Sequence, residues 1–369
     1  MKCRALKTAT FCIVGSMFMM AILSGMGSAQ TVSSSNATQE NQGDLLRDDK
    51  AAFARLKSLV DSQLSSAEQR QFNSSFAGLG LRNGEPGSSC SELHFMAKVN
   101  KVPEGRGDDK LDAVLEICAA STFWAGHTTL IFFLLSSVLS SEEFEARGES
   151  IMGDLAKYQN SMADDTLLSD STRLPMCPVI WATYFLAKYG RIGDCQGNGK
   201  SEYLSDAVAW LALNMNDNVR KMLPDAKFSV STNETEFMEF IEEMQKYFTR
   251  MIFDRVVLHE IGHIVLGHHR SQATSGKKGY DQLEHAADKF ATNKKPEDQM
   301  EQLLKYFVNV GLATHLVIHR GFSKEHRLEK SRVSDSYLVC ESLKALTSID
   351  IDPAMKAHAL QAEKKLSCP

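Results

Sequence analysis

The sequence predicts a mainly α-helical protein (α+β) with a small sheet. Its composition is that of an ordinary globular protein, with 43% hydrophobic and 24% charged residues, which excludes a disordered or collagenous chain. Apolar residues recur at steps of three and four in several segments, as expected for amphipathic helices. The best candidate for a strand is the short stretch 227–232, so the predicted sheet is small.

The N-terminus has the features of a secretory signal peptide, which we assign to residues 1–29. Lys2, Arg4 and Lys7 precede an apolar run at 9–23, and small residues follow it up to Ala29. This order of basic, apolar and small residues predicts cleavage near Ala29 and an exported protein, periplasmic or secreted. An uncleaved N-terminal anchor is the alternative, although the apolar run is short for a membrane span.

Cysteine usage agrees with export. Six cysteines follow the leader: Cys90, Cys118, Cys177, Cys195, Cys340 and Cys368. An even number in an exported chain permits three disulfides. Pairing in chain order (90–118, 177–195 and 340–368) is the simplest assignment, and a buried free thiol at Cys118 is the alternative because it lies in a strongly apolar run.

The mature chain divides into a flexible N-terminus at 30–43, a helical region of unknown role at 44–170, and a second domain at 171–369. Residues 30–43 are rich in Ser, Thr, Asn and Gln and lack an apolar pattern. From residue 44 the apolar spacing is helical, with loops expected at 73–90 and 100–109. Further helices are expected at 178–189 and 203–215.

The most apolar part of the mature chain, 111–140, is expected to be a buried core helix or helix pair. Glu116 and His127 interrupt it, whereas a membrane-spanning helix needs about 20 apolar residues. Contact with a membrane through this segment is therefore the alternative that we do not favour.

The charge balance argues against nucleic acid as a partner. The chain has 41 Lys and Arg against 46 Asp and Glu, a formal net charge of -5. Nucleic-acid-binding proteins ordinarily carry a basic excess or a basic stripe. We therefore expect no nucleic-acid partner.

The segment 256–270 carries the clearest chemistry. It contains His259-Glu260-x-x-His263 within an apolar, proline-free helical pattern. Two histidines four apart lie on one face of a helix, which suits two corners of a tetrahedral zinc site. Glu260 lies about 100° round the helix from His259, so it is placed to take a proton from a metal-bound water rather than to bind the metal.

Two residues compete to be the third zinc ligand. His269 stands ten residues after His259, but Leu266 occupies the position where the metzincin pattern has glycine, and an unbroken helix turns His269 about 80° away from His259. Glu284 and Asp288 share one face of a following helix. We favour Glu284 as the ligand, with Asp288 accepting the other N–H of a ligand histidine.

His259-Glu260-x-x-His263 followed by Glu284-x-x-Ala287-Asp288 resembles the gluzincin metallopeptidases, closest to the minimal-domain group that includes the CaaX-type endopeptidases. The resemblance covers about residues 227–335. It implies a zincin-like active-site helix pair beside a small sheet, and one zinc ion per chain held by two histidines and a glutamate. A later His-Pro…Arg-Ile element of such proteins has His326 and Arg332 at the matching spacing, but Arg327 replaces the proline.

The sequence therefore predicts an exported zinc peptidase that acts on a peptide or protein substrate. Glu260 is the expected general base, and His326 and Arg332 are candidate transition-state stabilisers. A peptide would extend along 227–232. Two other functions stay open: a binding protein whose metal site is structural, and a membrane-associated protein with 111–140 inserted.

Overall fold

The computed structural model describes residues 48–82, 97–101, 113–140, 176–190, 202–222, 229–271 and 277–294, together with 45–46, 308–309 and scattered residues within 143–155 and 340–364. Within these ranges the protein is mainly helical with one small sheet, which confirms the predicted fold class. The predicted leader, the segment 30–43, His326 and Arg332 lie outside the described residues.

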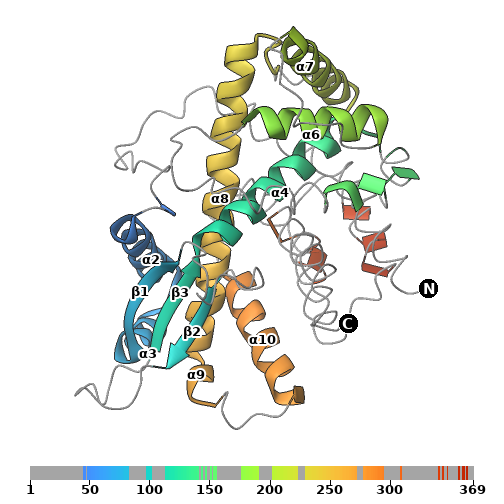
Figure 1. The fold of residues 1–369 in the computed structure, drawn as a ribbon. Helices are drawn as coiled ribbons and strands as arrows, with labels where there is room; N and C mark the ends of the chain where they lie inside the picture. The colour runs from blue at the N-terminus through green and yellow to red at the C-terminus, as the bar shows by residue number, and fades with distance from the viewer. Residues whose placement is uncertain are drawn as a thin grey trace.

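The described elements follow one another as three strands among helices (Figure 1). They are α2 (Asp49–Gln63), α3 (Ser66–Ser75), β1 (Phe76–Arg82), β2 (Ala97–Lys101), β3 (Ala113–Cys118), α4 (Ala119–Val138), α6 (Met176–Tyr189), α7 (Glu202–Met222), α8 (Glu234–Val265), α9 (His268–Ser271) and α10 (Lys277–Thr292). Helix α8 runs through the middle of the molecule, with the sheet near one end and α7 near the other.

The sheet has the strand order β1-β3-β2, with β1 parallel and β2 antiparallel to the central strand β3. It is built from the region predicted to be helical, and β1 and β2 occupy parts of the two expected loops, so those predictions were wrong. Residues of β3 alternate between buried and partly exposed: Leu115 and Ile117 are fully buried, while Val114 and Glu116 are partly exposed. This alternation is typical of a strand but spans too few residues to stand out within a longer apolar run.

Helix α4 is a buried core helix, as predicted for most of 111–140. It is buried on all sides and packs against α6, α7 and α8, as expected for a helix in the centre of a core. Its buried hydroxyls bond to carbonyls of the preceding turn, for example Thr128 Oγ1 to Trp124 O at 2.8 Å, so they cost little on burial. Among the described residues no helix is both long and apolar enough to cross a membrane.

The segment predicted to be the substrate-binding strand is not one. Its described part, 229–232, has no strand pairing. Instead the Asn216 side chain bonds both backbone groups of Val230, donating to its oxygen at 2.8 Å and accepting from its nitrogen at 2.7 Å. This turn precedes α8, and the 26 residues from Glu234 to His259 put it about 38 Å from the histidines along the helix.

His127 in α4 is buried and contacts Trp124 edge to face, with 5.0 Å between ring centroids. Burial lowers the pKa of His127 to about 4, although a hydrogen bond with Gln245 of α8 partly raises it. The neutral imidazole is therefore a satisfied core group, as expected for a histidine in this run.

We predict that His127 makes the fold sensitive to mild acid. Its pKa is lowered on folding, so the unfolded chain binds a proton first, and stability present above about pH 6.5 is lost as the pH falls towards 4. The linkage amounts to about 2 kcal/mol at pH 5. Urea denaturation of wild type and His127→Leu at pH 7 and pH 5 should show the larger loss in wild type; equal losses would contradict this assignment.

Candidate metal centre

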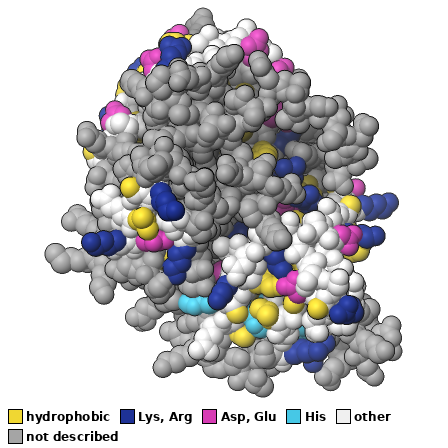
Figure 2. Space-filling view, turned by 180° about the vertical axis from the view of Figure 1, so that it is seen from behind, with side chains coloured by type: hydrophobic (Ala, Val, Ile, Leu, Met, Phe, Trp, Pro, Cys, Tyr) yellow, Lys and Arg dark blue, Asp and Glu magenta, His cyan; other side chains and the backbone are white. Residues whose placement is uncertain are grey.

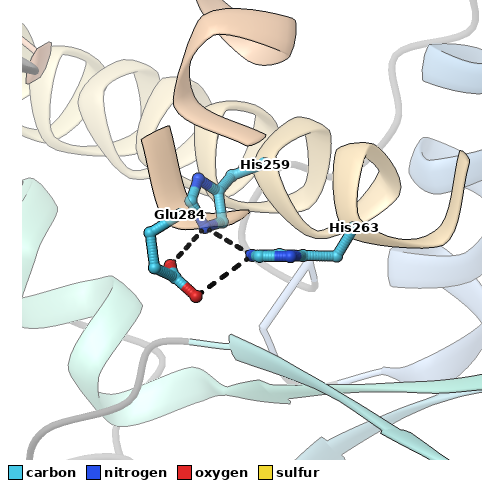
Figure 3. Close-up of side chains that lie close together, drawn as sticks. All are labelled: His259, His263 and Glu284. Carbon is cyan, nitrogen blue, oxygen red and sulfur yellow. Dashed lines mark hydrogen bonds and ion pairs between the residues drawn. The ribbon is translucent and has the colours of Figure 1, made fainter. Parts of the chain in front are cut away.

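The C-terminal end of α8 and the helix α10 bring three side chains to one point (Figure 3). His259 Nε2 lies 3.1 Å from His263 Nε2 and 3.2 Å from Glu284 Oε2, and His263 Nε2 lies 3.5 Å from Glu284 Oε1. Two atoms bound to one tetrahedral zinc at about 2 Å lie roughly 3.3 Å apart. The three donors therefore have the spacing and the N/O chemistry that a single zinc ion requires.

Close packing of α10 on α8 brings Glu284 next to the two histidines. A Cβ atom at Gly262 would lie 3.0 Å from the Phe290 ring and 3.3 Å from the Ala287 Cα, and Ala287 is fully buried. Small residues on both helices thus allow the close approach. Because Glu284 is one turn before Asp288 on α10, the same contact aligns both carboxylates with α8.

Asp288 fixes the orientation of His259. Its Oδ1 lies 2.9 Å from His259 Nδ1, the contact expected from sequence. A histidine that donates from Nδ1 leaves Nε2 free to bind a metal. Although burial lowers it, the charge and hydrogen bond of Asp288 and the contact with Glu284 raise the pKa of His259 to about 10.

His268 is a residue of the site that was not predicted from the sequence. Gly267 has a φ of 72°, a left-handed conformation that glycine adopts without strain, and it turns the chain from α8 into α9. His268 Nδ1 then lies 2.9 Å from His263 Nδ1. Burial, followed by the charge of His263, lowers the pKa of His268 to about 4, so its neutral ring can accept a hydrogen bond from the Nδ1–H of His263.

Glu260 is buried beside the three donors but is not among them. Its side chain is on the next helical position after His259, and the residue is 8% exposed. Burial raises the pKa of Glu260, although the charges of His259 and His263 lower it. A carboxylate with a raised pKa next to a metal position is a suitable proton acceptor.

The other candidate ligand, His269, is buried but is not part of the metal-binding group found among the described residues. Two of the three donor side chains are partly open to solvent: those of His259 and Glu284 are 17% and 22% exposed, whereas that of His263 is only 4% exposed. Figure 2, which views the molecule from behind, shows histidine side chains at the surface in its lower part, beside hydrophobic and basic ones.

Comparison with known proteins adds no assignment: no protein-family model, curated protein or solved structure matches the chain.

We predict a ligand order for this centre. The purified mature protein should bind about one zinc per chain, and His263→Ala or Glu284→Ala should weaken binding strongly, because each removes one of three donors. His269→Ala is the matched control and should keep zinc. Metal analysis after dialysis tests this; zinc lost in His269→Ala and kept in Glu284→Ala would overturn the assignment.

Proposed function

We propose that the protein is an exported, zinc-dependent peptidase of the gluzincin type. The observation that carries the proposal is the spacing of 3.1 to 3.5 Å among the donor atoms of His259, His263 and Glu284. A catalytic zinc has three protein ligands and an open fourth position, and three donors are what the described residues provide here.

When bound, zinc supplies a Lewis acid that polarises a carbonyl and makes a water acidic. Glu260 then takes the proton of the attacking water and delivers it to the departing amine. Burial raises the pKa of Glu260, which favours its accepting a proton and later releasing it. Asp288 and His268 hold the rings of His259 and His263 in the metal-binding orientation.

Strand β2 is the surface on which we propose that the substrate extends. It is the edge of the sheet next to β3 and packs against α8 and α9, which carry the histidines. An exposed strand edge can bind an extended peptide through main-chain hydrogen bonds. This replaces 227–232, which lies at the far end of α8.

We predict that Glu260→Gln keeps zinc but loses proteolysis by at least 100-fold, because it removes the base and no ligand. Exposed Glu243 on the same helix provides the control variant Glu243→Gln, which should keep full activity. Cleavage of a denatured protein substrate, followed with metal content, tests this. Unchanged activity in Glu260→Gln excludes Glu260 as the base, and zinc without any activity in wild type favours a structural metal site.

Export is supported by the leader and by cysteine chemistry. Cys118 and Cys340 are buried and disulfide-bonded, and such bonds persist in oxidising compartments. The chain-order pairing remains a prediction, because Cys90 and Cys368 lie outside the described residues.

We predict that the mature protein purified from an exported fraction, unfolded without reductant, contains at most two free thiols. Thiol titration before and after reduction measures this, and the reduced sample is the control. Six free thiols before reduction would contradict the disulfides and weaken the case for export.

A further inference from the structure

We propose that Arg255 is a positioning residue of the metal centre, acting on His259 through Asp288. This inference rests on the proposed zinc site and adds to it a residue that binds neither metal nor substrate. Arg255 is one turn before His259 on α8, and its Nη2 lies 3.2 Å from Asp288 Oδ1. The same oxygen lies 2.9 Å from His259 Nδ1. One carboxylate oxygen thus joins the guanidinium to the metal-binding ring.

The guanidinium is held in place by a second segment. Its Nε donates to Asn309 Oδ1 at 3.0 Å, so Arg255 links α8, α10 and residues 308–309. Only 8% of the Arg255 side chain and 8% of the Asp288 side chain are exposed. A planar guanidinium with several fixed donors can satisfy two acceptors in different directions, which a lysine ammonium on a flexible stem does less well.

Arg255 fixes the orientation of the Asp288 carboxylate. Asp288 can hold His259 in the metal-binding tautomer only while its own carboxylate cannot rotate. Burial makes an unpaired carboxylate costly, and the guanidinium provides both the opposite charge and the direction. Without Arg255, Asp288 would lose the opposite charge and the directed hydrogen bond of the guanidinium, and its carboxylate could turn away from the ring. Loss of such an outer partner typically costs about 10–100-fold in metal affinity.

A double-mutant cycle separates this role from a general effect on stability. Zinc affinity of the mature protein is measured by competition with a chelator for wild type, Arg255→Met, Asp288→Asn and the double variant. We expect Arg255→Met to weaken zinc about 10–100-fold. When Asp288 is already replaced by Asn, Arg255→Met should lower zinc affinity less than about threefold, because the residue through which Arg255 acts is already altered.

Arg55→Met is the matched control. Arg55 also pairs with a carboxylate of α8, donating from Nε to Asp254 Oδ1 at 2.8 Å, but Asp254 has no contact with the zinc ligands among the interactions described. We expect this variant to lower stability in urea without changing zinc affinity. If circular dichroism shows that Arg255→Met does not fold, Arg255→Lys takes its place. Lysine keeps the positive charge but lacks the planar guanidinium donors, and we expect zinc affinity to fall about tenfold.

The outcomes are distinct. Zinc affinity equal to wild type in the folded Arg255 variant, or equal losses in both backgrounds, overturns the positioning role while leaving the zinc site intact. A wild-type protein that binds zinc but cleaves nothing overturns the peptidase and not this inference. A wild-type protein that binds no zinc overturns both.

Discussion

The buried polar network at the end of α8 is the constraint around which this part of the molecule is organised. Four of its polar residues, Arg255, Glu260, His263 and His268, are less than 9% exposed, and burying such groups is costly unless they are paired. Partners have to come from outside the helix. Helix α10 supplies Glu284 and Asp288, and the turn at Gly267 supplies His268. The packing of α10 and α9 on α8 therefore also provides the partners that the buried polar side chains need.

The apolar core explains why α8 can carry this network. The helix is 32 residues long and has α4 packed along it, so the position of its last turns is fixed by contacts far from the histidines. At the crossing, a Cβ atom on Gly126 of α4 would lie 2.6 Å from Thr249 Oγ1 and 2.8 Å from its Cα. The two helices are in backbone-level contact there, and interiors packed this closely resist displacement.

The sequence was sufficient to predict which residues lie on the same face of one helix. His259 and His263, and likewise Glu284 and Asp288, are four apart on one helix, so each pair was predictable once a helix was predicted. The small sheet was predicted but placed in the wrong segment, because its strands are only 5 to 7 residues long and lie within apolar or glycine-rich stretches. His268 was missed because its position depends on the left-handed turn at Gly267. Arg255 was missed because its partner is 33 positions away on another helix.

The charges of the network indicate what kind of ion could bind where the three donors converge. Arg255 and Asp288 compensate each other, which leaves the two carboxylates Glu284 and Glu260 beside two imidazoles. Hydrogen bonds and charge from His259 and His263 lower the pKa of Glu284 despite its burial, and the nearby carboxylates raise the pKa of His259 to about 10. The lowered pKa of Glu284 reflects an attraction for positive charge at the point where the three donors converge, whereas the pKa of His259 is raised first by Asp288 at its other ring nitrogen. A divalent cation provides that charge and leaves both imidazoles neutral, as ligands must be. Arg255 cannot provide it, since its guanidinium is bound to Asp288 and Asn309 on the far side of the His259 ring.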